Sequence, residues 1–129
     1  MNRRTFMTLA AGVSIATGLA AVLAPAQVAA VFGVTLNDAG IAQTRLLGAA
    51  YLGYSALLWF ARDVRDVTAQ RAIALGNLVS WALSLVVTAA GIAAGLAGAQ
   101  SWLLVVLEVV FAGAWGYFAV IDQREVAAA

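Results

Sequence analysis

Residues 102–121 read WLLVVLEVVFAGAWGYFAVI, and this stretch decides the class of fold. It holds a single charged residue, Glu108, among apolar, glycine and aromatic side chains. A helix that crosses the hydrocarbon core of a bilayer needs about 20 predominantly apolar residues. The stretch therefore predicts a membrane-spanning helix that carries one carboxylate.

The composition of the whole chain agrees with a membrane location. Hydrophobic residues make up 64% of the 129 residues, charged residues make up 10%, and the mean hydropathy is +0.97. Soluble domains carry about 25% charged residues, so this chain is far less polar than they are. The length allows at most four or five spans of about 20 residues. We therefore expect a single membrane domain over residues 1–129.

Three further apolar runs precede residues 102–121, and short polar breaks separate them. Pro25 suits the first position of a short interfacial helix because it lacks an N–H group, and Gly33 is expected to end that helix. The predicted fold is all-α, an up-down bundle of four transmembrane helices with this interfacial helix after the first span. The predicted segments comprise spans at about 5–24, 40–60, 72–94 and 102–121, and an interfacial segment at about 25–33.

Polar residues mark the starts of the two central spans. Asn37 or Asp38 can cap the second span, because a side-chain oxygen accepts a hydrogen bond from the free N–H groups of a helix start. Asp66 or Thr68 can cap the third span in the same way. The pattern predicts separate helices on both sides of the charged segment at 61–66.

Arginine residues are distributed unevenly between the two ends of the predicted spans. Arg45 lies near the ends expected outside, and the other six lie near the opposite ends. These six are Arg3, Arg4, Arg62, Arg65, Arg71 and Arg124. Positively charged residues near helix ends are retained on the cytoplasmic side. The distribution, with an alanine- and arginine-rich composition typical of GC-rich bacteria, predicts a multi-pass protein of the bacterial inner (cytoplasmic) membrane with both termini cytoplasmic.

The first thirty residues allow a second interpretation. Arg3-Arg4, an apolar run and Ala24-Pro25-Ala26 are typical of a twin-arginine export signal with an A-x-A cleavage site. Such a signal delivers a folded soluble cargo, whereas the rest of this chain predicts further spans. We therefore expect the segment to remain as the first span, held by its two arginines.

Glu108 is expected to pair with Arg45 inside the membrane. Glu108 lies about two turns into the last span, which places it roughly 9 Å from the outer end at 1.5 Å per residue. Arg45 enters the second span from the same side. Because an isolated charge in hydrocarbon is costly, the two residues are predicted to form an intramembrane ion pair. Its role is open between a structural clasp and a proton- or ligand-linked site.

Small and polar residues recur at helical spacing on the predicted spans. The third span carries a polar stripe of Asn77, Ser80, Ser84 and Thr88. This stripe either lines a polar path from Glu108 or bonds to its own backbone, as serine and threonine often do in membrane helices. Glycines let helices approach closely in lipid. The predicted helix-packing positions are Gly48, Gly53, Gly91, Gly95 and Gly116.

A pattern between positions 25 and 62 resembles a known family. It comprises Pro25, Val31-Phe32-Gly33, Arg45-Leu46-Leu47-Gly48-Ala49, Leu52-Gly53 and Trp59-Phe60-Ala61-Arg62. The pattern is similar to that of small bacterial four-helix integral membrane proteins, a domain of unknown function that is loosely DoxX-like in shape. The resemblance implies the four-helix fold and carries no activity with it.

The residue types argue against an enzyme. Histidine and cysteine are absent, so the chain has no imidazole base, no thiolate and none of the commonest transition-metal ligands. We expect no catalytic residues, metal or cofactor, and the net charge of +1 gives no basic face for nucleic acid. The predicted function is a non-catalytic integral membrane protein, an accessory or structural subunit. Its expected partners are the lipid bilayer and either a larger membrane complex or a second copy.

The alternative is a small proton-coupled transporter that works as a homo-oligomer through Glu108. It is similar in size to small multidrug-resistance transporters. Their essential glutamate lies in the first helix, however, and the first predicted span of this chain has no acidic residue.

Overall fold

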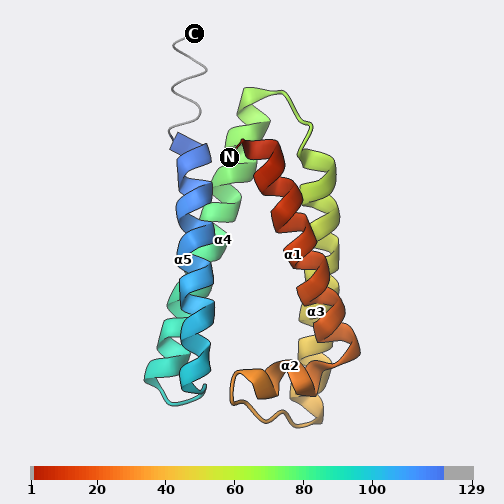
Figure 1. Ribbon diagram of the computed structural model, residues 1–129, viewed down its shortest axis with the longest axis vertical. Coiled ribbons are helices and arrows are strands. Elements are labelled where there is room, and N and C mark those ends of the chain that lie inside the picture. Colours follow the sequence, from red (N-terminus) through yellow and green to blue (C-terminus); the bar gives the residue numbers. More distant parts are fainter. Residues whose placement is uncertain (1, 121–129) are drawn as a thin grey trace. The chain divides into compact units, whose positions relative to one another are not determined.

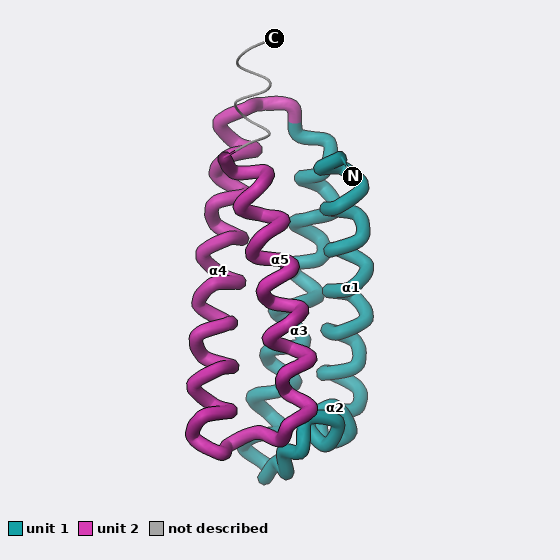
Figure 2. Tube along the Cα trace, turned by 60° about the vertical axis from the view of Figure 1, so that its left-hand side comes forward, with its two compact units in different colours: residues 1–64 teal, residues 65–129 magenta. Residues whose placement is uncertain are grey.

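The computed structural model describes residues 2–120, and within that range the chain forms helices and turns but no strand. The prediction of an all-α fold is confirmed. The chain divides into two compact units, residues 1–64 and residues 65–129, which Figure 2 distinguishes by colour. The elements in chain order are α1 (Arg3–Leu23), α2 (Pro25–Val31), α3 (Asp38–Ala61), α4 (Val67–Ala93), a 3-10 turn at Ala99–Ser101 and α5 (Trp102–Val120), as labelled in Figure 1.

The first unit is an antiparallel helical hairpin in which α1 packs along α3, with α2 between them in the chain (Figure 1). At one end, the Arg3 Nη2 donates a hydrogen bond to the Val64 carbonyl at 3.1 Å, and the Arg4 Nε lies 2.8 Å from the Asp63 Oδ1. Further along the hairpin the two backbones approach closely at Gly18. These contacts join the start of α1 to the end of α3.

The second unit is another antiparallel hairpin, formed by α4 and α5. Gly116 of α5 lies against Leu78 near the middle of α4, and the Phe111 ring stacks on the Trp81 ring. Because the helices are antiparallel, later residues of α4 contact earlier residues of α5, and these contacts reach Glu108. The pairing of α4 with α5 therefore brings two polar residues of α4, Ser84 and Thr88, beside the carboxylate of α5.

Side-chain caps begin three of the helices where the sequence places polar residues. The Asn2, Asn37 and Asp66 side chains accept hydrogen bonds from Thr5, Gly40 and Ala69 N–H groups at 2.7 to 2.8 Å. Such caps satisfy N–H groups that have no partner within the helix, each contributing about 1 kcal/mol. Of the alternatives left open by the sequence, Asn37 and Asp66 are thus the capping residues.

Two glycines end helices in the left-handed backbone region. Gly33 has a φ of 74° directly after α2, and Gly95 has a φ of 70° after α4. The Val34 N–H bonds to the Ala29 carbonyl, and the Leu96 N–H bonds to the Gly91 carbonyl. This pattern is the Schellman motif, which favours glycine because other residues are strained there. The expected stop at Gly33 is confirmed.

Three of the described helices are long and apolar enough to cross a membrane, not four. They comprise Arg3–Leu23, Val67–Ala93 and Ala99–Val120. Of the four predicted spans, three are therefore supported by length and composition, and the span at about 40–60 stays a prediction. Helix α3 has sufficient length, with 24 residues, but it is not among these three helices, and it contains Arg45 and the tyrosines Tyr51 and Tyr54.

Candidate functional site

Glu108 is a buried acidic residue in an otherwise apolar part of α5. Its side chain is 5% exposed, and the residues around it from Leu103 to Val110 are apolar. Because α5 pairs with α4 in an antiparallel arrangement, the Glu108 side chain lies beside the second half of α4. A buried carboxylate needs hydrogen-bond partners to offset the loss of water.

Two hydroxyl groups of α4 supply these partners. The Ser84 Oγ donates to the Glu108 Oε1 at 2.6 Å, and the Thr88 Oγ1 donates to the same oxygen at 2.9 Å. Ser84 and Thr88 are four residues apart and therefore lie on one face of the helix. The two hydrogen bonds link α4 to α5.

The two oxygens of the Glu108 carboxyl group differ in their surroundings. Oε1 accepts both hydroxyl bonds, whereas Oε2 is buried and makes no hydrogen bond with the residues that the structure describes. Hydrogen bonds are stronger in a medium of low dielectric constant than in water. Oε1 therefore links the two helices, whereas Oε2 can still accept a hydrogen bond.

An aromatic pair lies next to the carboxylate within the same hairpin. The Trp81 and Phe111 rings stack with their centroids 4.6 Å apart and an interplanar angle of 22°. Trp81 is three residues before Ser84, and Phe111 is three residues after Glu108, so the stack lies about one helical turn from the hydrogen bonds. The rings provide an apolar neighbour that favours strong hydrogen bonding at Glu108.

The predicted polar stripe is divided between two roles. Ser84 and Thr88 reach Glu108, but the Asn77 Nδ2 donates to the Ile73 carbonyl of its own helix at 2.8 Å. Ser80 is exposed. The structure therefore brings two of the four stripe residues to the carboxylate.

Arg45, the predicted ion-pair partner of Glu108, lies in the other unit. It is an exposed residue of α3, in the first turns after the Asn37 cap. Glu108 belongs to the unit that comprises residues 65–129. The Arg45–Glu108 ion pair stays a prediction.

The predicted helix-packing glycines differ in what surrounds them. At Gly48, a Cβ atom would lie 2.8 Å from the Gly18 carbonyl oxygen, so only glycine allows this approach of α3 to α1. At Gly116, it would lie 3.7 Å from Leu78, which is an ordinary contact. At Gly53 and Gly91, a Cβ atom would have no described atom within 4 Å.

Gly18 and Gly95 have different roles in the helices that contain or precede them. Gly18 forms the α1 side of the close approach, where a Cβ atom would lie 2.9 Å from the Gly48 carbonyl oxygen. Gly95, one of the predicted helix-packing positions, lies just beyond the predicted span at 72–94 and terminates α4. A small-residue stripe on α1, such as Ala11, Ser14, Gly18 and Ala21, is the sequence signal that can indicate Gly18.

The acidic residues do not gather into a cluster in the part of the chain from residue 2 to residue 120. No group of three or more histidine, cysteine, aspartate or glutamate side chains there is placed to hold a metal ion. The expectations about metals, cofactors and catalysis stay predictions.

Comparisons of the chain with models of protein families, with curated proteins and with solved structures found no match. The resemblance to small DoxX-like membrane proteins therefore stays a prediction.

Proposed function

We propose that this protein is a non-catalytic integral membrane protein that acts as an accessory or structural subunit of a larger membrane complex. The observation that carries the non-catalytic part of the proposal is the binding of the Glu108 Oε1 by Ser84 and Thr88. Both donors belong to the helix that pairs with α5, so the hydrogen bonds hold one hairpin together. In this role the carboxylate is a structural clasp.

The membrane setting is the bacterial inner membrane, with both termini in the cytoplasm. The three apolar helices support the membrane part of this proposal, and the arginine distribution supports the orientation. Helix α3 crosses the bilayer as the partner of α1, although its own composition is too polar to mark it as a span. The close approach of Gly18 to Gly48 supports this pairing.

The helix surfaces support lateral packing against another protein. Large apolar side chains are exposed on α4 and α5, including Val87 at 71% and Leu103 at 70%. Gly53 and Gly91 lie on helices at positions where a Cβ atom would have no described atom within 4 Å. Glycines of this kind let a second membrane helix approach closely, because association in lipid depends on tight packing.

The test is to tag the C-terminus at the native locus, extract the protein gently and record native mass spectra of what co-purifies. We expect a larger membrane protein in a stoichiometric ratio. Gly91→Leu should release this partner, and Gly116→Ala, which changes a contact inside the second hairpin, should retain it. A homodimer without other components would contradict the accessory role.

A specific observation favours a second function, a small proton-coupled transporter that works as a homo-oligomer through Glu108. The Glu108 Oε2 has no hydrogen-bond partner among residues 2–120, so one oxygen of a buried carboxyl group is available to bind a proton. In proteoliposomes with an imposed pH gradient, this function requires substrate movement that Glu108→Gln abolishes. Equal rates of substrate transport in the protein with Glu108 and in the Glu108→Gln variant would rule out this function.

A further inference from the structure

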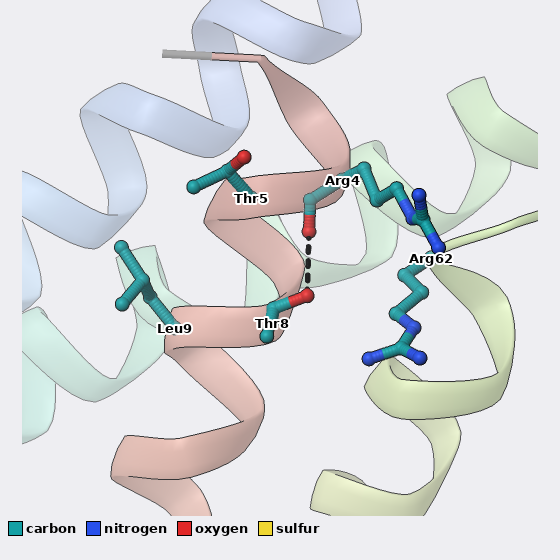
Figure 3. Close-up of a pocket in the computed structure, with 5 residues that line it drawn as sticks. All are labelled: Arg4, Thr5, Thr8, Leu9 and Arg62. Atoms are coloured by element: carbon teal, nitrogen blue, oxygen red, sulfur yellow. Dashed lines mark hydrogen bonds between the residues drawn. The ribbon is translucent and has the colours of Figure 1, made fainter.

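An open pocket lies at the arginine-rich end of the first unit. It has a volume of about 290 Å³ and is lined by Arg4, Thr5, Thr8 and Leu9 of α1 and by Arg62 at the end of α3. Figure 3 shows the Arg4 side chain on α1 and the Arg62 side chain at the end of α3, with Thr8 below Arg4 on α1. The pocket is thus formed where the start of α1 meets the end of α3.

Positive charge exceeds negative charge at this end of the hairpin. The Asp63 carboxylate lies 2.8 Å from the Arg4 Nε and 3.4 Å from the Arg62 Nε. The Arg3 guanidinium is also present and donates to the Val64 carbonyl. Each guanidinium has five N–H donors, far more than one shared carboxylate can accept. The pocket therefore has donors and charge for an added anion.

The Arg62 side chain is held in place before any ligand binds. Its guanidinium carbon lies 3.4 Å from the centroid of the Trp59 ring, and its side chain is 18% exposed. Stacking on an aromatic ring restrains the guanidinium and leaves its edge free to donate. On the other wall, the Thr8 Oγ1 donates to the Arg4 carbonyl at 2.9 Å, which orients that hydroxyl group.

The polar wall of the pocket adjoins an apolar surface. Leu9 lines the pocket about one turn further along α1 than Thr5, and it is 56% exposed. Helix α1 is apolar enough to cross a membrane, so its first turns lie at the level of the lipid headgroups when it does so. A ligand at this level would place a charged group beside the arginines and an apolar group beside Leu9.

We propose that this pocket binds the phosphate group of an anionic phospholipid. Guanidinium groups match the geometry of phosphate oxygens, and the hydroxyl group of Thr5, which also lines the pocket, offers a further polar contact. Leu9 contacts the apolar part of the same lipid. The cytoplasmic leaflet, where the arginine distribution places this end, carries the negative surface potential of anionic lipids. The proposal rests on the membrane setting proposed above and does not depend on the accessory role.

The test is native mass spectrometry of the full-length protein in detergent, titrated separately with phosphatidylglycerol, phosphatidylcholine and inorganic phosphate. We expect one phosphatidylglycerol to bind at least tenfold more tightly than phosphatidylcholine. Arg4→Gln and Arg62→Gln should each weaken this binding by about tenfold, the loss expected for one charge-assisted hydrogen bond. Arg71→Gln, which removes the same charge from an exposed site of α4, should weaken it less than twofold.

Three results would overturn the proposal. Equal binding of the two lipids would show that the pocket does not select anionic headgroups. Equal losses in Arg71→Gln and Arg4→Gln would show general attraction to positive charge without a site. Binding of inorganic phosphate that depends on Arg4 and Arg62, without any lipid preference, would assign the pocket to free phosphate. Arg4→Gln keeps the test valid if Arg62→Gln fails to fold, since the Arg4 side chain is 65% exposed.

Discussion

The hydroxyl groups of Ser84 and Thr88 can each bond to Glu108 or to a carbonyl of their own helix. In this protein both donate to the Glu108 Oε1. The choice matters because the backbone carbonyls of α4 are already bonded within the helix, whereas a buried carboxylate has no water to bind. The two hydroxyl groups therefore stabilise the folded state by donating hydrogen bonds to the buried Glu108 carboxylate.

Ser84→Ala is expected to lower the free energy of unfolding by about 1 kcal/mol, because Oε1 then loses its shorter hydrogen bond. Ser80→Ala is the matched control: Ser80 lies one turn earlier on α4 and is exposed, so its loss should change stability by less than about 0.5 kcal/mol. Equilibrium unfolding in detergent micelles measures both. Similar effects of the two substitutions would argue against the clasp.

The sequence predicted the components of the candidate site and left open whether the stripe that contains Ser84 and Thr88 reaches Glu108 or bonds to its own backbone. A single acidic residue in an apolar run is a clear signal, and the spacing of Ser84 and Thr88 places them on one helix face. Their contact with Glu108 depends on the register between α4 and α5, which packing of many side chains determines. Attraction between unlike charges led instead to Arg45, and that pairing stays a prediction.

At the level of helices, the pairing of α1 with α3 depends on two facing glycines. A Cβ atom on either Gly18 or Gly48 would lie within 3 Å of the other's carbonyl oxygen. Because the obstructing atoms belong to the backbone, a small rotation of a side chain cannot relieve the clash. The two helices must move apart to accept any larger residue.

Gly48→Ala should destabilise the first hairpin by about 1–3 kcal/mol, the usual range for an overpacked core. Gly53→Ala, on the same helix but with open space at its Cβ position, should be neutral or stabilise the protein by up to about 1 kcal/mol. Thermal unfolding of both variants in the same detergent compares them. If Gly48→Ala is as stable as Gly53→Ala, the close approach does not exist in the protein.

The helices themselves were the most predictable part of the fold. Pro25 and Gly33 enclose α2, and Asn37 and Asp66 begin α3 and α4, because caps and turns depend on local backbone chemistry. The sequence did not reveal the Gly18 contact, since close packing needs two partners and the pattern on one helix does not identify the other. Gly95 follows the predicted third span directly, and a glycine near a helix end suits both packing and termination.

For the whole molecule, the number of membrane crossings depends on α3. Counting apolar runs predicts four spans, yet three helices are apolar enough by themselves. Arg45, Tyr51 and Tyr54 lower the apolarity of α3, while its close contact with α1 offers it a protein surface in place of lipid. Composition alone cannot decide between these two effects, because a helix face that packs against another helix is shielded from lipid and need not be apolar.

Reporter fusions after residues 35, 64 and 129 test the proposed topology. We expect a periplasmic signal at residue 35 and cytoplasmic signals at residues 64 and 129, because α3 crosses beside α1 and the arginines near residue 64 remain inside. A periplasmic signal at residue 64 would mean that α3 does not cross. A periplasmic signal at residue 129 would contradict the cytoplasmic C-terminus.

The central claim is that the Glu108 carboxylate is a structural clasp, and the most direct test compares the stability of the whole protein in two backgrounds. The measurement is the free energy of unfolding in micelles. The double substitution Ser84→Ala with Thr88→Val is made first in the protein that has Glu108 and then in the variant Glu108→Leu, and each is compared with its own background. Beside Glu108, the pair of substitutions leaves a buried carboxylate without donors, and we expect a loss of about 1–3 kcal/mol. Beside leucine no carboxylate remains, so the loss should fall below about 0.5 kcal/mol. Equal losses in the two backgrounds would contradict the clasp.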